Sequence, residues 1–436
     1  MNAPRFFLIL LSLFFGFAAC NQQKTPDPPK PVAIDSLMYV PPRPGDLPKP
    51  ELDRYASQIQ DYYQHNLVEK GFNGGILVAK KGQVIFEAYH GFFNLQKRDS
   101  LTAHSAFHLA SVSKTFTAMA TLKLAETGKL NLDDDVKKFF PGFPYDNVTV
   151  KLLLSHRSGL PNYIYFMQRL GWNTHQYCSG DDVLSYLIKF KPPVTSQAGT
   201  HFEYCNTNFA LLGLIIEKAS GKSYADYLQS TFFTPLHMKD TYVFTIKDSA
   251  KAMPSYLGRR MERLTFLDLG LGDKNVYSTP EDLLKWDQCM YTTEIFSKQT
   301  LDEAFTPYSH EKPGIRNYGY GWRMNVYPNG RKIIYHNGWW HGNNAVFIRM
   351  IQDSATIIVL GNRYNPYIYK AKKMAEIFEP SSVMEDDEKG PSANGNNFNT
   401  ETSEPAAVKK VVHSSKKRRT RKIPPRKKVT KKKATT

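Results

Sequence analysis

Residues 108–118 have the sequence His-Leu-Ala-Ser-Val-Ser-Lys-Thr-Phe-Thr-Ala, which places a serine and a lysine three positions apart. In a helix, Ser111 and Lys114 would share one face, and their side chains could meet. A serine hydroxyl becomes a useful nucleophile when a neighbouring base takes its proton. Lysine can be that base if burial, a helix N-terminus or a nearby cation lowers its pKa. The stretch therefore predicts a lysine-activated serine nucleophile on a helix over 111–127 that Gly128 ends.

Two shorter motifs follow in the chain, Tyr-Cys-Asn at 204–206 and His-Asn-Gly at 336–338. Neither is specific alone, and Ser-x-x-Lys itself recurs at Ser414 in a basic tail that cannot build a pocket. Tyr-x-Asn occurs at Tyr145, Tyr204, Tyr327 and Tyr335. An isolated Lys114 would be interpreted as a solvated helix lysine, and an isolated Tyr204 as a core aromatic. The order of the motifs and their flanking residues favour catalysis instead.

With its flanking blocks, the chain resembles the serine β-lactamase-related family, which includes class C β-lactamases, D-Ala-D-Ala carboxypeptidases, D-aminopeptidases and esterases. The matching blocks are 108–118, Leu-Leu-Ser-His-Arg-Ser-Gly-Leu-Pro at 153–161, the segment 199–213, Tyr-Ser-Thr-Pro-Glu-Asp-Leu at 277–283, and Tyr-His-Asn-Gly at 335–338. The likeness covers roughly 52–378. It implies an α+β fold of the β-lactamase/transpeptidase type, with an antiparallel sheet flanked by helices and an inserted all-helical lobe. The catalytic cleft would lie between these two parts.

The resemblance implies roles for the first two motifs. Ser111 would form the acyl-enzyme, and Lys114 would take its proton. Tyr204 would share proton transfer with Lys114 and later protonate the leaving group. Asn206 would hold the amide of the substrate.

The third motif is expected to complete the cleft. His336 stands where lactamases more often have the lysine of Lys-Thr-Gly, and we expect it to act in binding or proton transfer; otherwise it is a structural histidine. Gly338 would let its strand approach the substrate, and the backbone N–H groups of Ser111 and Trp339 would form the oxyanion hole. Family members usually have small residues after this motif. Here Trp339, Trp340 and His341 follow, and their indoles would narrow the cleft or offer a stacking surface.

Hydrophobic patterning predicts strands at both ends of the domain and helices between them, which indicates α+β rather than alternating βαβ units. The expected helices are 52–70, 111–127, 181–190, 208–219, 224–233, 280–290 and 366–378. The expected strands are 75–79 and 84–89, joined as a hairpin, and 319–326, 332–336, 344–350 and 355–360.

The N-terminus resembles an export signal. Arg5 precedes the apolar run 6–15, and Gly-Phe-Ala-Ala-Cys ends at Cys20. This pattern predicts a signal peptide over 1–19, a lipid on Cys20 and a Pro-rich tether over 20–50; the alternative is an ordinary signal peptide with an incidental cysteine. We therefore expect an exported protein anchored in a bacterial envelope, and Asn21 favours the outer membrane.

The remaining cysteines are Cys178, Cys205 and Cys289, an odd number that implies no complete disulfide framework. Cys205 occupies the variable position of the second motif and is expected to be a packed small residue. The cysteine and histidine spacing does not fit a zinc site, so neither a metal nor a cofactor is predicted.

The basicity of the chain comes from its C-terminal end. Residues 409–436 contain 14 Lys/Arg and no acidic residue, so of the net charge of +17 only +3 belongs to the rest. Residues 379–436 have a disordered composition. The tail either contacts anionic envelope polymers or headgroups, or is merely solvated. Nucleic acid is disfavoured, since an exported protein rarely meets it and no folded nucleic-acid module accompanies the tail.

Together these features predict an envelope-anchored serine hydrolase that acts on D-amino-acid peptides of cell-wall type or on small esters. A β-lactamase is the alternative within the same class. A non-catalytic penicillin-binding-like module is the alternative from another class, although such a module would have no chemical need for all four of Ser111, Lys114, Tyr204 and His336.

Overall fold

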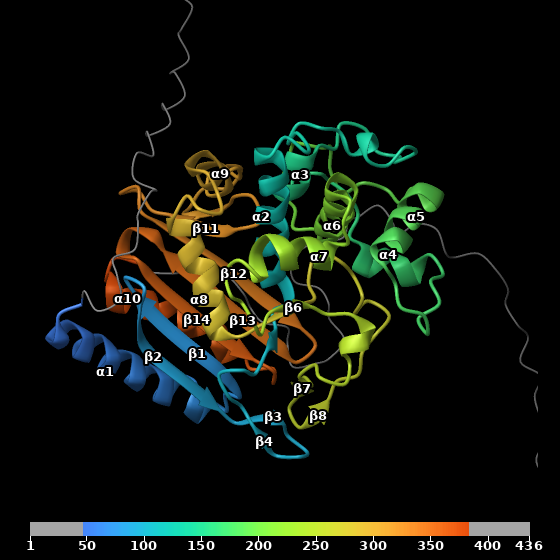
Figure 1. Cartoon of the computed structure of the whole chain (residues 1–436). Coiled ribbons are helices and arrows are strands. Elements are labelled where there is room, and N and C mark those ends of the chain that lie inside the picture. Colours follow the sequence, from blue (N-terminus) through green and yellow to red (C-terminus); the bar gives the residue numbers. More distant parts are fainter. Residues whose placement is uncertain (1–46, 383–436) are drawn as a thin grey trace, which may run out of the picture. The chain divides into compact units, whose positions relative to one another are not determined.

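The computed structural model describes residues 47–382, whose centre is a seven-stranded antiparallel sheet. In sheet order its strands are β10 Arg316–Tyr318, β11 Arg323–Val326, β12 Lys332–Trp340, β13 Asn343–Met350, β14 Ala355–Gly361, β1 Gly74–Lys80 and β2 Gln83–His90. The N-terminal hairpin adds to the C-terminal strands, because β1 pairs with β14 from Gly74 opposite Gly361 to Lys80 opposite Ala355. The two ends of the domain therefore build one sheet (Figure 1).

One face of the sheet is covered by helices from both ends of the domain. These are α1 Lys49–Asn66, the 3₁₀ helix η8 Pro366–Met374 and α10 Ala375–Phe378. Side chains that alternate along the strands point toward them, such as Ile76 and Val78 of β1 and Ile357 and Val359 of β14, all without solvent exposure. This apolar layer fixes which residues of each strand face the opposite side, where the site lies.

The opposite face carries α2 Ser113–Glu126, α8 Pro280–Gln288 and α9 Lys298–Ala304. Figure 1 shows α8 crossing in front of the sheet, and α8 contacts β1 and β14. Phe116 of α2 stacks on Trp286 of α8 with ring centroids 4.4 Å apart. The ion pair of Arg349 on β13 with Asp287 on α8 is buried in the same layer.

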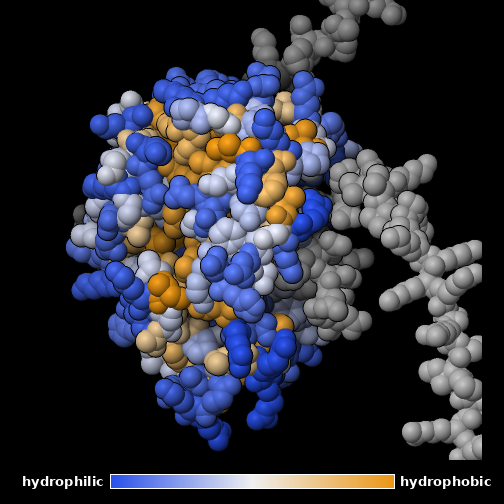
Figure 2. Space-filling model, turned by 90° about the vertical axis from the view of Figure 1, so that its right-hand side faces the viewer, coloured by the Kyte–Doolittle hydropathy of each residue, from blue (hydrophilic) through white to orange (hydrophobic). Residues whose placement is uncertain are grey.

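The middle of the chain forms a lobe of helices, at the right of Figure 1. Its helices are α3 Val150–Leu154, α4 Tyr163–Arg169, α5 Gly180–Phe190, α6 Asn206–Ser220 and α7 Tyr224–Leu228, which continues as a π turn over Gln229–Phe233. A capping box between Ser179 and Asp182 starts α5. The central helix α6 packs on α2, which joins the lobe to the sheet. Figure 2, viewed from this side, shows hydrophobic patches between hydrophilic residues.

Short strands complete the domain. β5 Phe107–His108, β9 Val276–Ser278 and β6 Tyr242–Val243 form a three-stranded sheet in the order β5-β9-β6. β3 Phe92–Asn94 pairs with β4 Asp99–Ser100, and β7 Tyr256–Leu257 pairs with β8 Arg260–Met261. The α+β prediction, with helices flanking an antiparallel sheet and a helical lobe inserted between its strands, is confirmed.

Most predicted elements occur near their expected bounds, and two differ in kind. The strand expected over 319–326 is wrong at its start, because the chain turns between β10 and β11. Gly321 there has a φ of +77°, and a Cβ on it would lie 2.3 Å from Cβ of Ala118. The last helix, expected over 366–378, is mainly 3₁₀.

Several predictions fall outside the described residues. These are the signal peptide, the lipid site at Cys20, the tether up to residue 46 and the basic tail from residue 383. Within 47–382, no helix is both long and apolar enough to cross a bilayer.

Candidate active site

Ser111 lies in one turn of 3₁₀ helix, η2 Ala110–Val112, directly before α2. The preceding residue, Ala110, has a φ of +48°, a left-handed conformation that costs a non-glycine residue about 1 kcal/mol or more. The surroundings hold this conformation, because the backbone N–H of Ala110 donates to Nδ1 of His108 over 3.0 Å. Ser111 is thus placed at the N-terminal end of a buried helix by a strained turn, as is common at functional sites.

Hydrogen bonds to β9 anchor this turn. The backbone N–H of Val276 donates to Oγ of Ser113 over 3.0 Å, and the N–H of Leu109 donates to the carbonyl of Val276 over 2.9 Å. Both bonds are buried, so the second serine of the motif has a structural task. Ser111, the predicted nucleophile, therefore lies between two residues, Leu109 and Ser113, that are both bonded to β9.

Lys114 is fully buried and points toward Ser111. Its Nζ lies 3.0 Å from Oγ of Ser111, and it donates to Oδ1 of Asn206 and to the backbone carbonyl of Asp273, each over 2.8 Å. Burial is the main cause that lowers the pKa of Lys114 to about 7, and the nearby charge of Lys274 acts in the same direction. At neutral pH a large fraction of Lys114 is therefore an uncharged amine.

The second motif reaches this lysine from the start of α6. Nζ of Lys114 lies 5.1 Å from the ring centroid of Tyr204, and the guanidinium of Arg323 lies at the same distance from that ring. His156, from the 153–161 block, packs on Tyr204 with centroids 4.3 Å apart, and its Nδ1 accepts from the N–H of Cys205 over 3.1 Å. The structure therefore brings Ser111, Lys114, Tyr204 and Asn206 together.

His336 is fully buried, as Lys114 is. Its role in binding or proton transfer stays a prediction. Nδ1 lies 2.7 Å from the carbonyl of Asn337, which can only accept; Nδ1 therefore carries the proton, and Nε2 faces the hydroxyl of Tyr318 at 3.3 Å. Burial holds the pKa of His336 well below its usual value, so the ring stays neutral. The ring centroid of His336 is 6.2 Å from that of Tyr204. In this position His336 can help to hold the ring of Tyr204 in place.

Gly338 allows β12 to lie directly against the turn that carries the nucleophile. A Cβ at this position would be 2.2 Å from the backbone carbonyl oxygen of Leu109 and 3.2 Å from Cβ of Ala110. A backbone atom cannot yield as a flexible side chain can. The close approach of strand and turn therefore requires glycine here.

A methyl group at Gly338 should thus separate β12 from the nucleophile. We expect Gly338→Ala to lower the rate at which Ser111 is acylated about a hundredfold, the usual cost of misplacing reacting groups by roughly 1 Å. The control is Gly180→Ala, whose Cβ would meet only the flexible side chain of Leu214 at 3.1 Å. Stopped-flow labelling with a fluorophosphonate measures both, and equal rates would contradict the steric argument.

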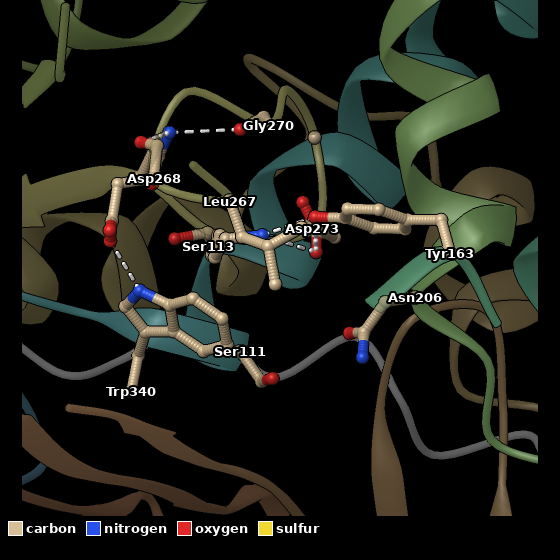
Figure 3. A network of polar contacts seen from close by, with 12 residues as sticks. Ser111, Ser113, Tyr163, Asn206, Leu267, Asp268, Gly270, Asp273 and Trp340 are labelled. Carbon is tan, nitrogen blue, oxygen red and sulfur yellow. Dashed lines mark hydrogen bonds and ion pairs between the residues drawn. The ribbon is translucent and has the colours of Figure 1, made fainter. Parts of the chain in front are cut away.

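The two tryptophans after the third motif face opposite sides of β12. Trp339 packs against the apolar layer beneath the sheet, and its Nε1 donates to the carbonyl of His341 over 2.9 Å. Trp340 lies on the face of Gly338, where its Nε1 donates to the Asp268 carboxylate over 2.5 Å (Figure 3). Our expectation that both indoles would shape the cleft is therefore corrected for Trp339. Its predicted backbone role in the oxyanion hole stays a prediction.

Asp268 fixes the indole of Trp340 and the ring of His341 together. Nε2 of His341 lies 2.9 Å from Oδ1 of Asp268, and the N–H and hydroxyl of Thr265 also donate to this carboxylate. Burial alone would raise the pKa of Asp268. The hydrogen bonds, of which that from His341 contributes most, lower this pKa to about 2. The carboxylate is ionised at every physiological pH, so Trp340 is held in one orientation.

Sequence reasoning missed several residues around Lys114. They are Tyr163, Asp268, Asp273, Lys274, Tyr318 and Arg323, and they come from four separate segments. The one local signal was the charged pair Asp273-Lys274 in a glycine-rich stretch before a strand. Among residues 47–382, no group of three or more His, Cys, Asp or Glu side chains could hold a metal.

The three cysteines of the described domain are buried away from solvent, which disfavours the reactive thiolate form. Cys178, Cys205 and Cys289 are free, buried thiols. Burial raises the pKa of Cys205 to about 11, and its thiol donates to the carbonyl of Leu160. Cys205 is a packed small residue that precedes α6 and contacts His156 and Leu160.

Comparison with known proteins agrees with this geometry. The family model described as beta-lactamase matches residues 53–377, which is most of the chain and the whole of the described domain except its ends. The chain belongs to the β-lactamase family. The family assignment and the fold implied by the motifs are thereby confirmed, and the family is one of serine hydrolases.

Two of the proteins similar to this β-lactamase-family protein are named penicillin-binding proteins, and a third is protein flp. Penicillin-binding protein 4* of Bacillus subtilis strain 168 is 32% identical over 338 residues, which cover 72% of this chain and 74% of the relative. Protein flp of Staphylococcus aureus strain MRSA252 is 28% identical over 331 residues, and the chain spans 64% of its length. A crystal structure of a penicillin-binding protein from Bacillus halodurans superposes with a TM-score of 0.64 at 25% identity, covering 72% of this chain and 98% of that one.

Proposed function

We propose that this protein is a serine hydrolase that forms an acyl-enzyme on Ser111, with D-amino-acid peptides of cell-wall type or small esters as substrates. The observation that carries the proposal is the 3.0 Å contact between Nζ of a fully buried Lys114 and Oγ of Ser111. The substrate class is supported by the penicillin-binding names of the relatives, because penicillins resemble such peptides.

Two fixed acceptors orient the base. A neutral amine has two hydrogens and one lone pair. Oδ1 of Asn206 and the carbonyl of Asp273 accept those hydrogens, each over 2.8 Å. The lone pair of Lys114 is then directed at the hydroxyl of Ser111, which is the arrangement that proton removal requires.

The chemistry follows from this arrangement. As Oγ of Ser111 bonds to the carbonyl carbon of the substrate, the hydroxyl proton passes to Lys114. The oxyanion that forms accepts hydrogen bonds from the backbone N–H groups of Ser111 and Trp339. Lys114, with Tyr204 beside it, returns the proton to the leaving amine or alcohol. Water then attacks the ester carbonyl on Ser111 and loses its proton to the same base. Lys114 passes this proton to Oγ of Ser111 as the bond from Oγ to the acyl carbon breaks and the acid leaves. Nδ2 of Asn206 is the group that would donate to the amide carbonyl of the substrate.

The acylation rate should depend on pH through Lys114. The pKa of this group is lowered to about 7, and the deprotonated form is the active one. The rate is therefore expected to rise with pH, from about a tenth of its maximum at pH 6 to about nine tenths at pH 8, and then to level off. Fluorophosphonate labelling rates between pH 5 and pH 10 measure this curve. A midpoint near 10 would show that burial does not lower the pKa of Lys114, and a rate that does not change with pH would show that Lys114 is not the base.

Covalent labelling tests the proposal. The protein from residue 21 onward is incubated with a fluorophosphonate and with a penicillin, and its intact mass is measured. We expect an adduct on wild type and on Ser414→Ala, which alters the second Ser-x-x-Lys motif, and none on Ser111→Ala. No adduct with either reagent on folded wild type would contradict the proposal and favour a non-catalytic binding module.

The penicillin arm separates the substrate classes. A lasting penicilloyl adduct would indicate a peptidase-like enzyme, because deacylation by water is then slow. Rapid release of opened drug would indicate a β-lactamase. Labelling by the fluorophosphonate alone would favour the esterase branch.

We further propose that the protein is exported and anchored in a bacterial envelope by a lipid on Cys20, with its basic tail on an anionic surface. The motif at 16–20 and the charge of 409–436 support this. Membrane fractionation of wild type and Cys20→Ser tests it. An equal distribution of both proteins in the membrane fraction would contradict the lipid anchor.

A further inference from the structure

An ion pair that no motif predicted is buried next to Lys114. The side chains of Asp273 and Lys274 are 2% and 3% exposed, and their Oδ2 and Nζ atoms are 3.0 Å apart. The hydroxyl of Tyr163, from α4 of the helical lobe, donates to the same Oδ2 over 2.9 Å and also receives a hydrogen bond from Lys274. Three polar groups from two segments thus form a closed cluster.

Asp273 connects this cluster to the base. Its carboxylate binds Lys274, while its backbone carbonyl accepts from Nζ of Lys114 over 2.8 Å. One residue therefore contacts both Lys274 and Lys114. Any displacement of the pair would move one of the two acceptors that orient Lys114.

Lys274 is held on its other sides by aromatic rings. Its Nζ lies 4.7 Å from the ring centroid of Trp340 and 4.9 Å from that of Tyr163. Trp340 is itself fixed by Asp268. In Figure 3 Trp340 and Asp268 lie on one side of the site and Asp273 and Tyr163 on the other. Nζ of Lys274 contacts both sides, through the ring of Trp340 and the carboxylate of Asp273.

Stability alone does not account for a buried ion pair here. Desolvation of two charges offsets most of their attraction, and apolar residues of similar volume often stabilise a fold as well. A pair with a defined geometry can still specify a unique arrangement of its neighbours. In this protein the neighbour of the ion pair is Lys114, whose amine donates to the backbone carbonyl of Asp273.

We propose that Lys274 is a positioning residue for the reaction at Ser111: paired with Asp273 and Tyr163, it holds the Asp273 carbonyl against Lys114 and adds a fixed positive charge beside that base. This inference rests on the proposed function. Lys274 does not itself need to touch the substrate. Its charge favours the uncharged form of Lys114, whereas the carboxylate of Asp273 favours the charged form.

Other titratable groups also face Lys114 and stay unchanged in the test. Arg323 of β11 repels its positive charge, and the thiol of Cys205 acts in the opposite direction. His156 and His336 are buried and neutral, and Tyr204 presents its ring. Any shift caused by substituting Lys274 can therefore be assigned to the pair.

The test is the pH profile of fluorophosphonate labelling, in which the Ser111 Oγ–P bond forms, fluoride leaves and the proton passes to Lys114. Removing one charge of a buried pair leaves Asp273 unopposed, so Lys274→Met should move the midpoint upward by about one pH unit. Lys274→Arg keeps the charge and should keep the midpoint. Lys285→Met, which removes a partly buried partner of Asp282, is the control for destabilisation and should also keep it.

A double variant keeps the inference testable if Lys274→Met does not fold. Asp273→Asn with Lys274→Met buries no lone charge; its midpoint should stay near that of wild type, while its maximal rate falls about tenfold or more because the carbonyl is less firmly held. A wild-type rate in the double variant, or an unshifted midpoint in a folded Lys274→Met, would overturn the positioning role. Wild type that is not labelled at any pH would overturn the proposed function instead.

Discussion

Replacing Lys114 by methionine is expected to lower the rate of Ser111 acylation about a thousandfold, within the range that a general base contributes. Methionine fits the buried volume but has no lone pair that can accept the serine proton. It also leaves Oδ1 of Asn206 and the Asp273 carbonyl without their shared donor. Single-turnover labelling by a fluorophosphonate at pH 8 measures the loss.

Lys114→Arg distinguishes the need for a base from the need for a charge. Guanidinium does not deprotonate at any accessible pH, so this variant should be nearly as slow as Lys114→Met although it keeps a cation. The control is Lys123→Met, which alters a half-buried lysine on the same helix, paired with Glu126, and should label at the wild-type rate. Substantial activity in Lys114→Arg would contradict proton removal by Lys114 and favour a purely electrostatic role.

Arg349→Met is expected to lower the free energy of unfolding by about 3–5 kcal/mol, because it leaves a buried charge without its partner. Arg349 is fully buried on β13, and its guanidinium binds both the carboxylate and the backbone carbonyl of Asp287 on α8. Thr356 of β14 donates to the second carboxylate oxygen. Without the arginine, that hydroxyl is the main support left for the Asp287 charge. Urea unfolding followed by circular dichroism measures the change.

Two further variants test the cause of this loss. Lys49→Met removes an exposed ion pair with Asp53 and should leave the unfolding midpoint unchanged, since such pairs contribute little. Arg349→Met combined with Asp287→Asn removes the lone charge and should recover a measurable part of the stability. A loss below about 1 kcal/mol for Arg349→Met alone would show that the pair does not join sheet and helix energetically.

Local pattern was sufficient for many elements because their cause is local. The hairpin of β1 and β2 lies at 74–90, where two apolar runs flank a turn, and α5 begins where Ser179 and Asp182 form a capping box. The pattern was not sufficient at 319–322, where the chain turns and Gly321 packs against Ala118, a residue about 200 positions earlier. It also missed that 366–374 is 3₁₀, which apolar spacing does not distinguish from α.

The sequence by itself determined that the proposed nucleophile and its proposed base lie side by side. Ser111 and Lys114 meet because they are three residues apart on a helical turn, and the ordered flanking motifs identify the family. The sequence did not determine where the indoles of Trp339 and Trp340 lie, because the expected strand ended at residue 336, whereas β12 continues to Trp340. Within that longer strand the two side chains alternate between its faces.

Only the tertiary structure decided which groups surround that base. Asn206, Asp273 and Tyr204 reach Lys114 from positions more than 85 residues away, and Lys274 joins them through a buried ion pair. Burial of His336 likewise comes from Tyr318 and other rings that pack over its strand. The pKa of Lys114 depends on desolvation and on these charges. Both arise from the packing of distant segments, so the serine was visible in the sequence, but the state of its base was not.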